Sequence, residues 1–336
     1  MATVYHDDDA DLKIVQGRHA AVLGFGNQGR AQALSLRDSG VDVRVGLPLD
    51  SLRRPSAEAE GLRVVTPYEA CEEADLVVVL VPEQAQRWVY GEAIGPNLVD
   101  GDGMIFGHGF NLHYGFIQPP PEVDVGLVAT TVAGNVVRRE YVEGRGVPVL
   151  VAFDQDATGR AWPLTLSYAK AIGGLRGGGI ETTVGEQTET DLFGSRAVRG
   201  GGVTQLVIAG FQTLTSAGYS PEVAYLQCLQ GVKEIVDLMY ERGIAEQREA
   251  VSALAQYAGQ SGGMGRIDPG VASRLGQILD NIRDGTLARA FIADQDAGAP
   301  ELAASRARAE HHPIEDVGRE VRALMPWVRP EPGQDF

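Results

Sequence analysis

The feature that most constrains this chain is an alternation, in its first half, of short β-branched runs with longer amphipathic stretches. The runs predict strands, which lie at residues 20–25, 41–46, 62–65, 75–81, 103–109, 124–130 and 148–153. Helical patterns separate several of them, including 28–39, 68–74 and 83–94. Parallel neighbours need crossover connections, so this order predicts an α/β domain with a parallel sheet covered by helices on both faces.

The pattern changes after about residue 183. Apolar positions recur at helical spacing through 201–218, 221–243, 246–257, 272–289 and 300–325. We therefore predict an α/β domain over residues 1–183 and an all-helical domain over residues 184–328. The tail, 329–336, is polar, terminal and contains prolines, so we expect it to be disordered.

Charge and cysteine content narrow the class of protein. With 29 basic and 45 acidic residues among 336, the formal net charge is -16, which opposes binding to nucleic acid or to anionic membranes. An acidic N-terminus without a long apolar run is untypical of a signal peptide or a membrane span, so we expect a cytoplasmic protein. The two cysteines, Cys71 and Cys228, have no metal-site spacing, which favours free thiols.

A glycine motif, GFGNQG at residues 24–29, lies between the first predicted strand and the first predicted helix. Its glycines permit a tight turn, close approach of a pyrophosphate, and close packing of helix on strand. The helix N-terminus then faces the phosphate charge. The motif predicts a Rossmann-type dinucleotide site built from Gly24, Phe25, Gly26, Asn27, Gln28 and Gly29.

The loop after the second predicted strand bears on cofactor choice. It reads LPLDSLRRPS and carries Ser51, Arg53 and Arg54, which suit the 2′-phosphate of NADPH through charge-assisted hydrogen bonds. Asp50 in the same loop suits a free ribose, so NADH stays open. These arginines are also compatible with plain solvated charges.

Several longer motifs together resemble one family, the short-form ketol-acid reductoisomerases. The resemblance runs through VYHDDDADL, GFGNQGRAQALSLRDSGVDVRVGL, GHGFNLHYG, VRREYVEGRGVPVLVA, LSYAKAIGG, ETTVGEQTETDLFG and LMPWV. It implies a knotted helical domain, a homodimer with an active site drawn from both chains, and a two-step reaction. Family members isomerise an acetohydroxy acid by a magnesium-assisted alkyl shift and reduce the resulting ketone with NADPH.

The chain departs from this family at the residues that hold its two magnesium ions. The resemblance implies four carboxylates in two i, i+4 pairs. Here Asp191 is retained, but Ser195, Gln227 and Gly231 occupy the other three positions. One carboxylate cannot offset the charge of two divalent cations, so we expect no magnesium and no metal site.

A second departure follows Val128. The chain reads ATTVAGNVV, which places Thr131 where the family has a lysine and Asn135 where it has a histidine. We expect Thr131, Asn135, Gln227 and Ser252 to face the substrate. His108 and Asp191 lie in intact family motifs, and we expect His108, Glu189, Asp191 and Ser195 to take part in catalysis.

Loss of the metal ligands and of the lysine removes positive charge from the predicted pocket. A protonated imine accepts hydride without a Lewis acid, and a bare Asp191 would stabilise it. The leading hypothesis from the sequence is therefore a metal-independent, NADPH-dependent reductase of a small imine, cyclic imines included, in secondary metabolism. His108, or a water held by Ser195 or Glu189, would handle protons.

Three alternatives stay open at this point. They are a ketone or 2-keto acid reductase with His108 as proton donor, an authentic ketol-acid reductoisomerase, and a catalytically inactive cofactor-binding protein.

Overall fold

The computed structural model describes residues 2–263 and 269–328. The expected disordered tail, 329–336, lies outside the described residues. The chain forms two compact units, the first ending at Thr190 and the second beginning at Asp191. The division falls within helix α10 (Val184–Phe193), and the sequence-based boundary at 183/184 is the start of that helix.

The first unit contains a nine-stranded sheet among the described residues, with strand order β1-β9-β8-β7-β6-β5-β2-β3-β4. The part from β7 to β4 is parallel and has the strand order of a Rossmann fold. The strands are β1 (Val4–Tyr5), β2 (His19–Leu23), β3 (Asp42–Gly46), β4 (Arg63–Val65), β5 (Leu76–Val79), β6 (Gly103–Phe106), β7 (Asp124–Thr130), β8 (Val149–Gln155) and β9 (Gly179–Glu181).

The predicted parallel arrangement is confirmed from β4 to β7, but the sheet is mixed, because β8, which the sequence also placed among these strands, is antiparallel to β7. Strand β8 runs antiparallel to β7, with Thr130 opposite Val149, and β1 runs antiparallel to β9. Helix α7 (Gly134–Val142) connects β7 to β8 and packs against α2 (Asn27–Asp38), where Ala31 and Val137 share an apolar cluster. Strand β8 thus begins at the same end of the sheet at which β7 ends, so the chain does not cross the sheet between them.

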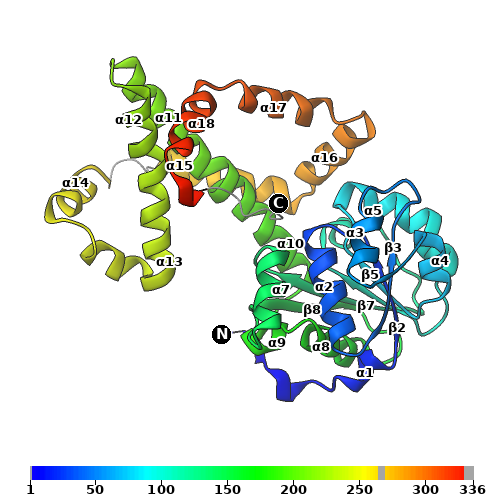
Figure 1. Ribbon diagram of the computed structural model, residues 1–336. Coiled ribbons are helices and arrows are strands. Elements are labelled where there is room, and N and C mark those ends of the chain that lie inside the picture. Colours follow the sequence, from blue (N-terminus) through cyan, green and yellow to red (C-terminus); the bar gives the residue numbers. More distant parts are fainter. Residues whose placement is uncertain (1, 264–268, 329–336) are drawn as a thin grey trace. The chain divides into compact units, whose positions relative to one another are not determined.

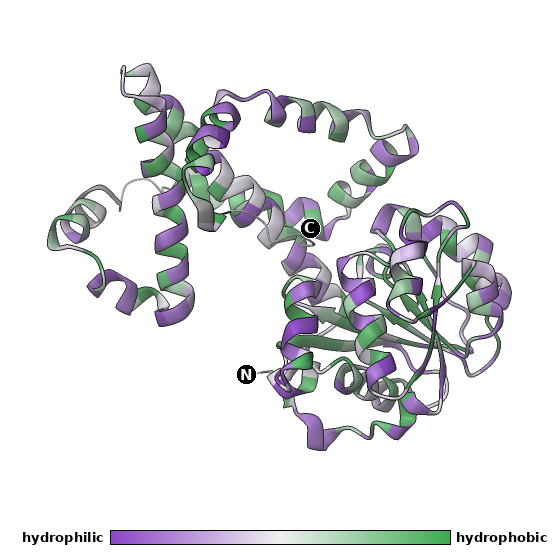
Figure 2. Cartoon of the chain, in the orientation of Figure 1, coloured by the Kyte–Doolittle hydropathy of each residue, from purple (hydrophilic) through white to green (hydrophobic). Residues whose placement is uncertain are grey.

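Alternating side chains of the strands build two core layers, one on each face of the sheet. In β2, Ala20 and Val22 belong to one hydrophobic cluster and Ala21 and Leu23 to the other. Helices α2 and α8 (Ala161–Ala171) cover the first layer, and α4 (Pro67–Glu72) with the π-helix η2 (Tyr90–Ile94) covers the second. Figure 2 shows the strands as mostly apolar and the covering helices as mixed in hydropathy.

The remaining helices of the first unit are short. They are η1 (Asp7–Asp9), α1 (Lys13–Gln16), α3 (Arg54–Ala59), α4 (Pro67–Glu72), α5 (Glu83–Val89), the π-helix η2 (Tyr90–Ile94), η3 (Gly95–Asn97), α6 (Phe110–His113), α8 (Ala161–Ala171) and α9 (Gly174–Gly177).

The second unit is helical throughout its described residues, as predicted (Figure 1). Its elements are the π-helix η4 (Gly194–Val203), α11 (Thr204–Ser216), α12 (Pro221–Tyr225), the π-helix η5 (Leu226–Gln230), α13 (Gly231–Glu249), α14 (Ala253–Gly263), α15 (Pro269–Arg283), α16 (Thr286–Asp296), α17 (Pro300–Glu310), α18 (Pro313–Ala323) and η6 (Pro326–Val328).

The core of the second unit is small. Val207, Phe211, Tyr225, Ile314 and Val321 form its buried centre, together with Ala224, where α11, α12 and α18 meet. Many large apolar side chains elsewhere in this unit are exposed, although Ile282 and Ile292 are buried. No helix within the described residues is long and apolar enough to cross a membrane.

Candidate functional site

The glycine motif forms the predicted turn between β2 and α2. Gly24 adopts φ 99°, a left-handed conformation that favours glycine, and a Cβ there would lie 3.0 Å from the Leu80 carbonyl oxygen. A Cβ at Gly29 would lie 2.3 Å from the carbonyl oxygen of Gly24, so only glycine lets α2 pack this closely. The turn lies at the carboxyl end of β2, between β5 and β3, where Rossmann folds bind dinucleotides.

The N-terminus of α2 offers the backbone amides that a pyrophosphate needs. Gly26 precedes the helix, and a Cβ there would meet no atom closer than 3.8 Å, which leaves room for phosphate to approach the backbone. Phe25 contributes its carbonyl, which accepts a hydrogen bond from Arg53 Nη1 at 2.8 Å. These features fit a bound dinucleotide.

The loop that follows β7 packs directly on the glycine motif. Gln28 Nε2 donates to the Val132 carbonyl oxygen at 2.7 Å, and the Asn135 backbone N–H donates to Asn27 Oδ1 at 3.1 Å. A Cβ at Gly134 would lie 2.1 Å from the Asn27 carbonyl oxygen. The structure therefore places Asn135 beside the motif, while Thr131 Oγ1 donates to the carbonyl oxygen of Pro148 at 3.2 Å.

The two predicted phosphate-binding arginines have different environments. Arg53 is exposed, and its backbone N–H donates to Ser51 Oγ at 3.3 Å. Arg54 is half-buried and donates to the backbone carbonyls of Leu47 at 2.9 Å, Val64 at 3.2 Å and Val65 at 3.3 Å. The guanidinium of Arg54 joins the ends of β3 and β4, so we expect a structural role for it, and its assignment to the cofactor stays a prediction.

His108 follows β6, at the same edge of the sheet as the glycine turn. Its Nδ1 accepts a hydrogen bond from the Phe110 N–H at 3.1 Å. An acceptor Nδ1 places the proton of a neutral imidazole on Nε2, which makes Nε2 a donor. In its neutral form His108 would therefore present Nε2 as the donor.

Glu189 has a partner that the sequence did not reveal. Its Oε1 lies 3.2 Å from His113 Nε2, and this pair links α10 to α6. Gln187 Oε1 likewise accepts from the Gly109 N–H at 3.0 Å. The carboxylate of Glu189 therefore anchors α10 on α6, and its proton-handling role stays a prediction.

Asp191 is not a bare carboxylate. Arg199 Nη2 donates to Asp191 Oδ1 at 2.8 Å and to the Asp191 carbonyl oxygen at 3.1 Å, and it also donates to Ser195 Oγ. Asp191, Ser195 and Arg199 are spaced four residues apart, at the end of α10 and in η4. Sequence reasoning missed Arg199, although this i, i+4, i+8 spacing could have revealed it.

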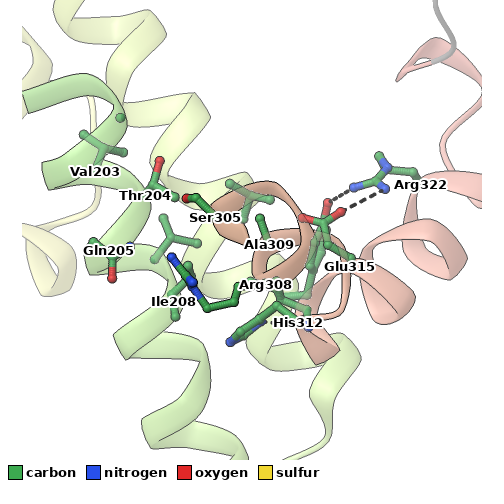
Figure 3. A pocket seen from close by; sticks show the side chains of 15 residues that line it. Val203, Thr204, Gln205, Ile208, Ser305, Arg308, Ala309, His312, Glu315 and Arg322 are labelled. Carbon is green, nitrogen blue, oxygen red and sulfur yellow. Dashed lines mark hydrogen bonds and ion pairs between the residues drawn. The ribbon is translucent and has the colours of Figure 1, made fainter. Parts of the chain in front are cut away.

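The other predicted substrate residues lie elsewhere in the second unit. Gln227 is exposed in η5. Gly231 begins α13, the helix that follows η5 directly. Ser252 Oγ accepts from the Ala255 N–H at 3.2 Å and so caps α14. A cavity of about 650 Å³ lies between α11, α17 and α18, and it is lined by none of Asp191, Gln227 and Ser252 (Figure 3).

These residues do not fit a dimagnesium centre. Two magnesium ions need several anionic oxygen ligands, whereas Ser195, Gln227 and Gly231 supply no negative charge and Arg199 adds a positive one. Within residues 2–263 and 269–328, no three His, Cys, Asp or Glu side chains lie close enough to share a metal ion.

The glycine turn, the open helix N-terminus and the Rossmann strand order define the chain as a nicotinamide-dependent oxidoreductase. Comparison with known proteins gives the family. Residues 14–178 match the NADPH-binding domain of acetohydroxy acid isomeroreductase, and residues 185–327 match the C-terminal domain of ketol-acid reductoisomerase. The chain belongs to the ketol-acid reductoisomerase family.

Relatives match along nearly the whole chain. A ketol-acid reductoisomerase (NADP(+)) of Kineococcus radiotolerans is 58% identical and covers 98% of this chain and 96% of its own length. One of Saccharopolyspora erythraea is 51% identical, covering 98% and 99%. The solved structure of an NADH-preferring ketol-acid reductoisomerase from an uncultured archaeon has a TM-score of 0.90 and 37% identity, covering 96% and 99%. Proteins of both cofactor preferences thus resemble this chain.

Proposed function

We propose that this enzyme reduces a small 2-keto acid to a 2-hydroxy acid with NADPH, which is the reductive half of the family reaction. A hydride adds to the carbonyl carbon and a proton to its oxygen. The observation that carries the proposal is the Asp191–Arg199 ion pair, which lies where the resemblance implies metal ligands. The N–H donors that Asp191 and Ser195 leave free on this guanidinium can bind the carboxylate of an anionic substrate, and a cation paired with Asp191 opposes binding of divalent metal ions there.

The cofactor would be held by the first unit. NADPH supplies the hydride when bound. The backbone amides at the start of α2 would bind its pyrophosphate, and the Gly24 turn and Gly26 leave space for it. Ser51 and Arg53 would hold the 2′-phosphate, so that NADPH is preferred over NADH.

Negative charge develops on the carbonyl oxygen as the hydride arrives, so the oxygen needs a proton or a hydrogen-bond donor. His108 would provide the proton from Nε2, because its Nδ1 is already an acceptor for the Phe110 N–H. The Glu189–His113 pair and the Gln187 contact hold the segment that carries His108.

The imine hypothesis loses the electrostatic basis that it had in the sequence. It depended on a carboxylate with no cation beside it, whereas Arg199 lies 2.8 Å from Asp191 Oδ1. The paired groups have no net charge and so do not favour an iminium. Small cyclic imines belong in the substrate panel as the competing class.

The experiment is NADPH oxidation with small 2-keto acids, neutral ketones and cyclic imines, each with EDTA and with excess magnesium. We expect turnover of 2-keto acids that survives EDTA. Turnover restricted to cyclic imines would refute the proposed substrate class. An absence of NADPH oxidation with the whole panel, in a protein that binds NADPH, would instead indicate a cofactor-binding protein.

Complete isomeroreduction of an acetohydroxy acid is the second candidate. The observation in its favour is 58% identity over 98% of the chain to a protein named for that activity. It predicts conversion of 2-acetolactate that stops on chelation and returns with magnesium. The departures at Ser195, Gln227 and Gly231 predict that the wild-type chain fails this test.

We also propose that the chain forms a homodimer through its helical unit. Tyr240, Ile244, Leu254 and Tyr257 of α13 and α14 are each at least 65% exposed, and such apolar faces on a helical unit with a small core favour burial against a second copy. Sedimentation analysis should give a dimer, and Tyr240→Glu with Leu254→Glu should shift the protein toward the monomer.

A further inference from the structure

The π-helix η4 carries a cation, Arg199, which contacts Asp191 and Ser195. Arg199 is one of two exposed arginines in this π-helix, the other being Arg196. All the contacts of Arg199 use one nitrogen, Nη2, which donates to Asp191 and Ser195. The guanidinium is therefore fixed at one end.

The guanidinium has further donors besides those of Nη2. Arginine has five N–H donors, of which three lie on Nε and Nη1. Among the described residues no hydrogen bond involves Nε or Nη1 of Arg199, and 60% of the side chain is exposed. Nε and Nη1 lie on different edges of the guanidinium and cannot share one carboxylate, but either nitrogen can donate a charge-assisted hydrogen bond to a carboxylate oxygen.

Local backbone geometry keeps Arg199 in this place. Residues 200–202 are all glycine, and a Cβ at Gly201 would lie 1.8 Å from the carbonyl oxygen of Arg196. The π-helix thus depends on glycine immediately after Arg199. π-Helices are rare and are frequent at functional sites.

We infer that Arg199 binds the carboxylate of the substrate and so determines specificity for small anionic keto acids. Asp191 and Ser195 are positioning residues, because they hold Nη2 and orient the free donors. This inference rests on the proposed function for the identity of the substrate. The carboxylate-binding property itself can be tested without turnover.

The binding experiment is calorimetric titration of oxamate, an uncharged-amide analogue of a 2-keto acid that keeps the carboxylate, into the NADP⁺ complex. We compare the wild type with Arg199→Gln and with the matched control Arg196→Gln. Arg199→Gln should weaken oxamate binding about ten- to a hundredfold, as expected for loss of charge-assisted hydrogen bonds. Arg196→Gln should leave binding within about twofold, because within the described residues no hydrogen bond or ion pair joins the Arg196 side chain to Asp191 or Ser195.

A kinetic arm compares 2-oxobutanoate with its methyl ester. Arg199→Gln should raise KM for the acid about ten- to a hundredfold and change KM for the ester little. The Kd of NADPH should stay unchanged, which controls for misfolding. An equal effect on acid and ester would overturn the inference, as would unaltered oxamate binding in Arg199→Gln or no oxamate binding by the wild type.

The two arms separate this inference from the proposed function. If the wild type binds oxamate through Arg199 but oxidises no NADPH with any keto acid, the proposed function fails and the anion-binding role of Arg199 stands. If keto acids are reduced equally well by Arg199→Gln, the proposed function stands and the inference fails.

Discussion

Arg53 and Arg54 are adjacent in sequence, but their contacts predict that replacement by alanine changes a different property at each position. Arg53 is exposed and makes a single side-chain hydrogen bond, to the Phe25 carbonyl. Arg54 makes three, to the carbonyls of Leu47, Val64 and Val65. Arg53→Ala should therefore change cofactor choice, and Arg54→Ala should change stability.

Hydrogen-bond energies give the size of each effect. Hydrogen bonds to a charged group contribute roughly 1.5–3 kcal/mol, so Arg53→Ala should reduce the preference for NADPH over NADH by about ten- to a hundredfold. Arg54→Ala leaves three carbonyls without this donor, and a loss of roughly 1.5–3 kcal/mol would lower Tm by about 3–12 °C in a unit of this size. Each variant is the control for the other.

Two measurements decide between these outcomes. Fluorescence titration with NADPH and NADH gives the ratio of Kd values, and thermal unfolding gives Tm. The reasoning is refuted if Arg53→Ala keeps the wild-type ratio, or if Arg54→Ala loses NADPH selectively with an unchanged Tm. Tighter binding of NADH by the wild type would assign the ribose to Asp50 instead.

Three further predictions concern single positions. Gly29→Ala should abolish dinucleotide binding, because its Cβ would lie 2.3 Å from a backbone oxygen, whereas Gly91→Ala, with no atom within 4 Å, should bind as the wild type does in the same titration. Burial raises the pKa of the Cys71 thiol to about 12. The thiolate that alkylation needs is therefore scarce at pH 8 and becomes more abundant as the pH rises. Mass spectrometry should find Cys71 unmodified by iodoacetamide at pH 8 until the protein is denatured. Ser252→Ala should destabilise the first turn of α14 by roughly 0.5–2 kcal/mol, which hydrogen exchange can detect, and Ser252→Asp should restore it; a substrate role would instead appear as a raised KM in both variants.

Local patterns were sufficient to predict most elements and the cofactor loop. Strand residues such as Val22 and Leu23 alternate between the two core layers, and Gly29 satisfies a steric requirement set by Gly24 within the same motif. The direction of β8 could not be obtained in this way. It depends on α7 packing against α2, a contact between segments about 100 residues apart in the chain.

The roles of individual charged residues were decided by tertiary contacts. The sequence places Asp191, Ser195 and Arg199 at helical spacing, but only the structure shows that Arg199 neutralises Asp191. Likewise, Arg54 turned out to bind strand carbonyls and Glu189 to pair with His113. Periodicity and glycine chemistry act over short stretches of chain and can be read from the sequence, whereas the partner of a long charged side chain depends on which distant groups the fold brings within a few ångströms.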